Sequence, residues 1–211
     1  MKRFLGIVLL AFLVLAMALP LGCAKNEKKE SVKEEKTKET ESKETEEAEP
    51  EEETEFAVTS SAFENDGDIP IKYAHTSAGG ENVSIPLKWE NAPEGTESLA
   101  IAIVDKHPVA NNFLHWLVLN VPLDTTSIDE GASGNSMPAD ATEFKNGYGE
   151  DGYGGPAPPP GPEAHEYEIT VYALSIPSMS MTENAGLAEF ESFTKDKVLG
   201  KATITGKFAG E

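Results

Sequence analysis

The chain has 211 residues, of which 17 are basic and 37 acidic, so its formal net charge at pH 7 is −20. After residue 55 there are 23 acidic residues, eight lysines and no arginine. Proteins bind nucleic-acid phosphates and anionic lipid surfaces through clusters of cationic side chains, so this composition argues against both as partners.

Residues 1–22 are predicted to be a signal peptide of the lipoprotein type. The chain begins Met1-Lys2-Arg3, carries no charge over residues 4–21 and reaches its single cysteine, Cys23, directly after a glycine. A bacterial lipoprotein is cleaved and acylated at such a cysteine, so we expect an extracytoplasmic protein anchored in the membrane through a lipid on Cys23. Cleavage after Ala18 with secretion, and a retained signal anchor, are the alternatives. A single cysteine allows no internal disulfide, so folding depends on core packing.

Residues 23–55 are predicted to be a disordered tether. Between residues 24 and 55 there are 14 glutamates and seven lysines, and almost nothing apolar. Such a segment cannot bury enough surface to offset the loss of chain entropy on folding. We expect a solvated spacer between the membrane and the domain; a tail that binds a cation or a partner is the alternative. Residues 56–211 are long enough to form one domain with its own core.

This domain is predicted to consist mostly of strands. Short alternating segments are separated by glycine, proline and asparagine clusters, which is typical of an antiparallel sandwich or barrel. One helix is expected over residues 183–199, where Leu187, Phe190 and Phe193 fall close to helical spacing. The alternating segments are 56–63, 69–73, 85–89, 99–104, 113–121, 165–174 and 202–208.

Two long connections interrupt the strands, residues 124–153 and the proline-rich loop that follows. Loops of this length in a compact domain are usually functional or disordered. Residues 146–155 mix tyrosines with glycines, which favours a shaped surface, and a plain linker is the alternative.

A carboxylate and a histidine are expected to meet at one end of the sheet. Asp105 follows the segment 99–104 on its apolar side, and His115 lies near the start of the next strand, where alternation places it on one face with Leu117 and Leu119. If these two strands pair as a hairpin, the end of the first lies beside the start of the second.

A second histidine is a candidate for the same place. His165 begins a segment in which it shares a face with Tyr167, and it joins Asp105 if its strand runs parallel to that of His115. Each residue alone could be a hydrogen-bonded core residue or a turn cap. Burying the three together costs several kcal/mol unless they satisfy one another or a ligand.

Several motifs occur in order over about residues 57–208. They are Ser84-Ile85-Pro86-Leu87-Lys88-Trp89, Ala92-Pro93-Glu94-Gly95-Thr96, Ile103-Val104-Asp105-Lys106-His107-Pro108, His115-Trp116, Gly152-Tyr153-Gly154-Gly155-Pro156-Ala157-Pro158-Pro159-Pro160-Gly161 and His165-Glu166-Tyr167. The combination resembles the phosphatidylethanolamine-binding protein (PEBP) family, whose bacterial and archaeal branch is labelled Raf kinase inhibitor-like, and it is more specific than any one motif.

The resemblance implies an all-β fold, a PEBP-like β-sandwich of two antiparallel sheets with small peripheral helices. It also implies a shallow pocket for a small anion such as phosphate or for a phospholipid head group, without a cofactor or a metal ion. The residues carried over by motif are Asp105, His115, His165, Tyr167, Pro158 and Pro159, to which we add His107, Tyr153 and Gly155 as candidate ligand-binding residues.

In such a pocket Asp105 would favour the imidazolium form of a nearby histidine, which donates from both nitrogens to phosphate oxygens. Asp105 would also receive an amine if the ligand carried one. The chain departs from the family's motifs at Lys106, His107, Gly147 and Glu166. His107 stands in place of a second carboxylate, Glu166 in place of an arginine and Gly147 in place of a serine.

The predicted function is that of a non-catalytic, membrane-tethered binding protein. An inhibitor or regulator of a partner protein is one alternative. A metal-dependent hydrolase that uses Asp105, His115 and His165, with His107 as a further ligand, is another. The absence of a Gly-x-Ser-x-Gly elbow and of a catalytic cysteine disfavours a hydrolase. Formation of a homodimer stays open, and no sequence feature identifies a protein partner.

Overall fold

The computed structural model describes residues 54–182 and 185–210. The predicted signal peptide, Cys23 and nearly all of the predicted tether lie outside these residues. Within the described part of the chain, no helix is long and apolar enough to cross a membrane. The strands are β1 (Ala57–Thr59), β2 (Gly67–Asp68), β3 (Leu87–Glu90), β4 (Ser98–Asp105), β5 (Phe113–Pro122), β6 (Ser127–Ile128), β7 (Thr142–Glu143), β8 (His165–Leu174) and β9 (Val198–Phe208).

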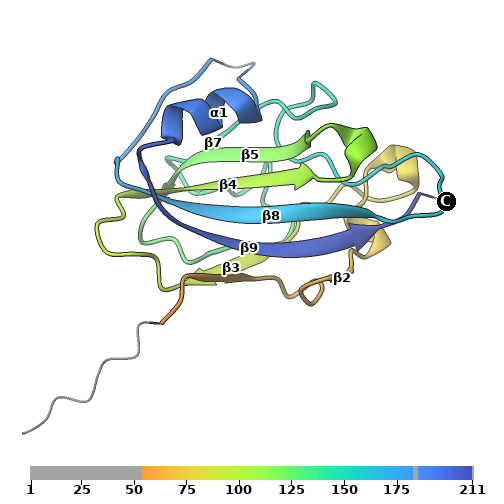
Figure 1. The fold of residues 1–211 in the computed structure, drawn as a ribbon, viewed down its shortest axis with the longest axis horizontal. Coiled ribbons are helices and arrows are strands. Elements are labelled where there is room, and N and C mark those ends of the chain that lie inside the picture. The colour runs from red at the N-terminus through yellow and green to blue at the C-terminus, as the bar shows by residue number, and fades with distance from the viewer. Residues whose placement is uncertain (1–53, 183–184, 211) are drawn as a thin grey trace, which may run out of the picture. The chain divides into compact units, whose positions relative to one another are not determined.

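These strands form two sheets, as the predicted sandwich requires. The smaller sheet has the order β1-β3-β6, and the larger has the order β2-β9-β8-β4-β5-β7. All neighbours are antiparallel except β2 and β9, which are parallel. Figure 1 shows β5, β4, β8 and β9 side by side, with α1 (Leu187–Thr194) and β3 on opposite sides of them.

The middle of the large sheet is buried on both faces, which explains the composition of its central strand β4. All eight residues of β4 are buried. Leu99, Ile101 and Ile103 contribute to the core between the two sheets. Ala100 and Ala102 belong to a second apolar cluster on the other face, where Phe190 of α1 is fully buried. A strand covered on both sides becomes almost continuously apolar.

One predicted strand is wrong. Residues 69–73 alternate, but Ile71–Tyr73 forms a 3-10 helix. The amide of Tyr73 donates to the carbonyl of Pro70 at 3.0 Å, and that of Ala74 donates to Ile71 at 2.9 Å. Pro70 has no N–H to offer to a neighbouring strand, so a short helical turn that uses only its carbonyl is favoured over extension of the sheet.

The predicted helix is real but shorter than residues 183–199. It runs from Leu187 to Thr194, and the amide of Lys197 then donates to the carbonyl of Thr194 at 2.8 Å. Val198 already pairs with Leu174 in the large sheet. Because Val198 pairs with β8, the helix ends before the last apolar residue that falls at helical spacing. Residues 183–184 lie outside the described residues.

Candidate ligand-binding pocket

Three strand ends meet at one end of the large sheet. β4 lies between β8 and β5 and is antiparallel to both, so β8 and β5 run parallel and both begin where β4 ends. Asp105, the last residue of β4, lies opposite Phe113 of β5 and Tyr167 of β8. The condition left open by the sequence is therefore met: the strand of His165 runs parallel to the strand of His115.

A β-bulge in β5 controls the direction of His115. Ile103 pairs with Trp116, whereas its neighbour Val104 pairs with Leu114. His115 therefore has no partner of its own in β4. An extra residue of this kind interrupts the alternation of side chains and re-aims one of them.

The bulge overturns the predicted face of His115. Trp116 packs into the core between the sheets. His115 lies on the same side, with its ring centroid 5.1 Å from that of Tyr167. Leu117 and Leu119 belong to the cluster on the opposite face. The prediction that His115 shares their face is wrong, because simple alternation does not hold across the bulge.

The proline-rich loop is pressed against the chain near Tyr73. A Cβ added to Gly155 would collide with the backbone of Tyr73 and Ala74, so glycine is required there. The amide of Gly155 donates to Oδ1 of Asn82 at 2.7 Å, and its carbonyl accepts from the hydroxyl of Tyr148 at 3.0 Å. These contacts hold Tyr148 and the following prolines over the strand ends.

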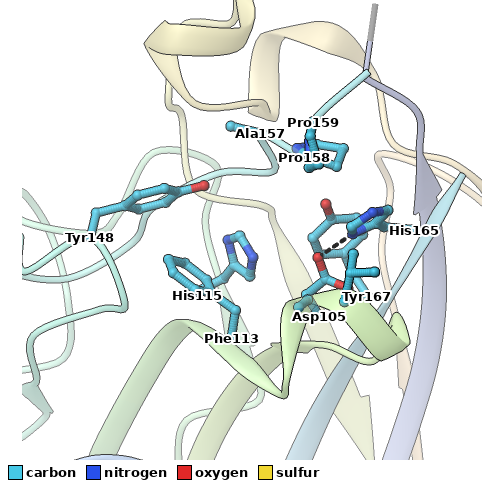
Figure 2. Close-up of a pocket in the computed structure, with 11 residues that line it drawn as sticks. Asp105, Phe113, His115, Tyr148, Ala157, Pro158, Pro159, His165 and Tyr167 are labelled. Carbon is cyan, nitrogen blue, oxygen red and sulfur yellow. Dashed lines mark hydrogen bonds and ion pairs between the residues drawn. The ribbon is translucent and has the colours of Figure 1, made fainter. Parts of the chain in front are cut away.

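Strand ends and loop together enclose a pocket of about 300 Å³. Figure 2 shows Tyr148 on one side of it, the prolines across from the strand ends, and Asp105 beside His165. Several of its walls are aromatic rings. The lining residues are Asp105, Val109, Ala110, Phe113, His115, Tyr148, Ala157, Pro158, Pro159, His165 and Tyr167.

Asp105 and His165 form a buried pair in this pocket. Nδ1–H of His165 donates to Oδ2 of Asp105 at 2.6 Å, and each residue is 4% exposed. The other carboxylate oxygen accepts from the backbone N–H of His107 at 2.9 Å. The ring of His107 stacks on that of His165, with 3.9 Å between centroids. Both oxygens of Asp105 are thus held in place by the chain, and the imidazole of His165 is fixed on two sides.

His115 is held in a neutral form. Its Nδ1 lies 2.7 Å from the carbonyl oxygen of Gly154, and a carbonyl only accepts, so Nδ1 carries the proton. Burial lowers the pKa of His115, and the Gly154 carbonyl and the charge of Asp105 oppose this only in part. At pH 7 the ring therefore carries a lone pair on Nε2. The expectation that Asp105 holds a nearby histidine as imidazolium does not apply to His115.

The hydroxyls of two tyrosines are the remaining polar side-chain groups of the pocket. The hydroxyl of Tyr167 is buried and has no hydrogen-bond partner among the described residues, and Figure 2 shows it directed toward the proline side of the pocket. Burial and then the charge of Asp105 raise the pKa of Tyr167, whose hydroxyl lies near the Asp105 carboxylate but makes no hydrogen bond of acceptable geometry with it. Burial likewise raises the pKa of Tyr148 to about 12. Both hydroxyls remain protonated at neutral pH.

Most of the candidate residues come together. Asp105, His115, His165, Tyr167, Pro158 and Pro159 all line the pocket, and His107 stacks behind His165. Tyr153 does not reach the pocket, because its ring lies in the core and its hydroxyl donates to the carbonyl of Tyr73 at 2.8 Å. Gly155 contributes through its backbone, as described above, and does not line the pocket.

Sequence reasoning missed two aromatic walls of the pocket. Tyr148 stands in the same run of glycines and tyrosines as Tyr153, which is the predicted residue. The two tyrosines differ in their tertiary contacts: the hydroxyl of Tyr148 donates to the carbonyl of Gly155, whereas that of Tyr153 donates to the carbonyl of Tyr73 in the core. Phe113 lies directly opposite Asp105, so the predicted hairpin contained a signal for it. Its ring fills the space beside Gly147, where an added Cβ would collide with it.

The described residues hold no group of three or more histidine, cysteine, aspartate or glutamate side chains that could bind a metal ion.

Several proteins of known sequence are similar to this chain. A UPF0098 protein of Aquifex aeolicus is 32% identical over 151 residues, which span 72% of this chain and 86% of that protein. YbcL, a UPF0098 protein of Escherichia coli, is 32% identical over 156 residues, or 71% and 85% of the two chains. A Mycobacterium tuberculosis protein named as a candidate lipoprotein, LppC, is 30% identical over 156 residues, or 72% of each.

Solved structures agree with the sequence comparisons. The crystal structure of E. coli YbcL, described as a member of the mammalian PEBP family, matches with a TM-score of 0.70 and 29% identity, over 75% of this chain and 100% of that one. The PEBP homologue CT736 of Chlamydia trachomatis matches with a TM-score of 0.63 and 25% identity, over 74% and 98%. The family model described as phosphatidylethanolamine-binding protein matches residues 59–209, and the chain belongs to that family.

Proposed function

We propose that this chain is a non-catalytic, extracytoplasmic binding protein, tethered to a membrane, that holds a phosphoethanolamine-type head group or a related small anion in the pocket around Asp105. The hydroxyl of Tyr167 is the observation that carries this proposal. It is buried, faces the pocket and has no partner among the described residues. A buried polar group without a hydrogen bond is costly, so a site that keeps one is suited to a ligand that supplies it.

The remaining polar groups match the two ends of such a head group. The hydroxyl of Tyr167 can donate to a phosphate oxygen, and the ring of His165 is oriented by Asp105. Asp105 and the lone pair of His115 can accept from an amine. The pocket volume of about 300 Å³ lies at the small end of the range of ligand sites, which suits a head group.

The tethered location rests on the residues before the domain. Cys23 follows an uncharged stretch and a glycine, and the similar protein LppC is named as a candidate lipoprotein. The acidic composition of the domain gives it no attraction to an anionic lipid surface. A lipid anchor accounts for membrane attachment without such attraction.

Calorimetric titration of the full chain with phosphoethanolamine tests the binding. His165→Ala and Tyr167→Phe are each expected to weaken binding by about tenfold or more, because each removes a hydrogen bond to a charged group. Tyr172→Phe is the matched control, since Tyr172 is on the same strand but packs against Phe190 on the other face. Equal affinities in all four proteins would defeat the proposal.

The two other parts of the proposal have their own tests. Radiolabelled palmitate is expected to label the wild-type chain in a bacterial host but not the Cys23→Ser variant. Equal labelling of the two proteins would contradict a lipid anchor at Cys23. Phosphoethanolamine incubated with the full chain is expected to be recovered intact by phosphorus NMR. Release of inorganic phosphate that disappears in His115→Ala would show an enzyme instead.

A further inference from the structure

The Tyr148 wall of the pocket is supported by a histidine that is not itself a lining residue. The ring of His75 stacks on that of Tyr148, with 4.4 Å between centroids and an interplanar angle of 21°. Phe113, which does line the pocket, meets the Tyr148 ring edge to face at 4.8 Å. Tyr148 therefore contacts one ring that belongs to the pocket lining and one that lies outside it.

The chain holds the ring of His75 in one orientation. Its Nδ1 accepts from the backbone N–H of Ser77 at 3.2 Å and lies 2.7 Å from the hydroxyl oxygen of the same residue. Because a backbone N–H only donates, Nδ1 carries a lone pair, and the proton of the neutral ring is on Nε2. Nε2 lies 3.4 Å from Oε2 of Glu150, two residues after Tyr148. Both ring nitrogens of His75 thus face a polar group of the chain.

The backbone of His75 is joined to the proline-rich loop independently of its side chain. Its N–H donates to the carbonyl of Pro156 at 3.0 Å, and its carbonyl accepts from the N–H groups of Ala78 and Gly80. A substitution of the side chain leaves all three bonds available. The effect of such a substitution therefore reports the contacts of the ring.

Tyr148 depends on tertiary contacts because it stands in a glycine-rich turn. It lies between Gly147 and Gly149, and Gly149 has a φ of +82°, which glycine adopts without strain. The hydrogen bond to the carbonyl of Gly155 fixes the hydroxyl end of the side chain, and the stack on His75 fixes the plane of the ring. A side chain that is ordered only when a ligand binds reduces affinity by about two- to tenfold.

We propose that His75 is a positioning residue of the pocket: its ring holds Tyr148 in place before the ligand arrives, and so favours compact ligands over bulky ones. This inference rests on the proposed function and adds to it a residue that sets the size of the ligand. His75 acts only through Tyr148, because it is not among the residues that line the pocket.

Two substitutions of His75 separate its ring from its nitrogens. His75→Ala and His75→Phe both remove the nitrogens, but only phenylalanine keeps a ring that can stack on Tyr148. In calorimetric titration of the full chain, His75→Ala is expected to bind phosphoethanolamine about two- to tenfold more weakly than the wild type. His75→Phe is expected to bind as the wild type does. Equal losses in the two variants would overturn the inference.

The size of the ligand gives a second measurement. Methyl phosphate and phenyl phosphate carry the same phosphate group and differ in bulk. The ratio of the affinity for methyl phosphate to that for phenyl phosphate is expected to fall in His75→Ala and to stay at the wild-type value in His75→Phe. A loss of stability alone would weaken both ligands equally and leave this ratio unchanged, and an unchanged ratio in His75→Ala would contradict the size selection.

A double-mutant cycle tests whether His75 acts through Tyr148. In a Tyr148→Ala background, His75→Ala is expected to change phosphoethanolamine affinity by less than about twofold, because the ring that it supports is absent. The full loss in both backgrounds would mean that His75 acts elsewhere. If Tyr148→Ala binds too weakly to measure, the comparison of His75→Ala with His75→Phe decides.

The outcomes separate the inference from the function on which it depends. Binding of phosphoethanolamine with equal affinity by the wild type and His75→Ala overturns the role of His75 and leaves the binding function. Failure of the wild type to bind phosphoethanolamine, methyl phosphate and phenyl phosphate overturns both.

Discussion

Replacing Tyr167 by phenylalanine is expected to stabilise the empty protein while weakening its ligand binding. The side chain is 1% exposed, so phenylalanine keeps the packing, and the hydroxyl it lacks has no partner among the described residues. A buried, unsatisfied hydroxyl costs about 1–3 kcal/mol, so Tyr167→Phe is expected to raise the free energy of unfolding by about that amount. For a domain of this size each kcal/mol raises Tm by about 2–4 °C.

Urea denaturation and calorimetric melting of the full chain without ligand measure this effect. Two other tyrosines serve as controls. Tyr153→Phe is expected to destabilise the protein by about 1 kcal/mol or more, because it leaves the carbonyl of Tyr73 without its 2.8 Å hydrogen bond. Tyr172→Phe is expected to bind phosphoethanolamine as the wild type does. The same preparations give the affinity, so stability and binding are compared in identical samples.

A Tyr167→Phe protein that is less stable than the wild type would refute the reasoning. That result means that the hydroxyl of Tyr167 is satisfied in the empty protein, and the pocket then has no unmet hydrogen bond to offer. Increased stability together with unchanged affinity would separate the two steps: the hydroxyl would be unsatisfied but not used by the ligand.

Three further expectations follow from the site and the core. Burial lowers the pKa of His115, so the unfolded chain binds a proton at this residue more readily than the folded protein, and stability should fall as the pH drops below the ordinary histidine value of about 6.5. Urea titrations at pH 5 and 8 should show that His115→Asn loses less stability at low pH than the wild type. Equal losses of stability would contradict the neutral assignment of His115. Gly155→Ala should destabilise the protein by about 1–3 kcal/mol or more in the same assay, since its Cβ meets the backbone of Tyr73; wild-type stability would mean that the loop can shift. Phe190→Ala should cost about 3–5 kcal/mol, because the ring is fully buried under the sheet, and should leave phosphoethanolamine affinity unchanged in folded protein; lost affinity would couple the far face to the pocket.

The long central strands were predictable because their signal is local. β8 runs from His165 to Leu174, as the alternation indicates, and no end of β4 or β5 differs from the predicted segments by more than one residue. Period-2 patterns report which side chains share a face whenever the strand is regular. Asp105 was placed correctly on the face of Ile103 for this reason.

Errors arose where a distant part of the chain changes a local pattern. The predicted helix stops at Thr194 because residues from Val198 onward pair with β8, and residues 69–73 leave the strand pattern at Pro70. Tyr148, rather than Tyr153, lines the pocket because the loop folds back onto Gly155. None of these contacts leaves a periodic trace in the sequence.

By itself, the sequence determined the two-sheet architecture, the family and the identity of the polar residues, because alternation, turn residues and motif order can be read directly along the chain. The tertiary structure decided that His165 joins Asp105 and His115, which the sequence left conditional on strand order. The strand order β8-β4-β5 makes the strands of His165 and His115 parallel, and the bulge at His115 turns its ring toward Tyr167. The tertiary structure also sets the protonation state of His115, because its hydrogen bond to the carbonyl of Gly154 and its burial exist only in the folded protein. Strand order joins residues that are far apart in sequence, and alternation reports only which side chains of a strand share a face, not which strands are neighbours.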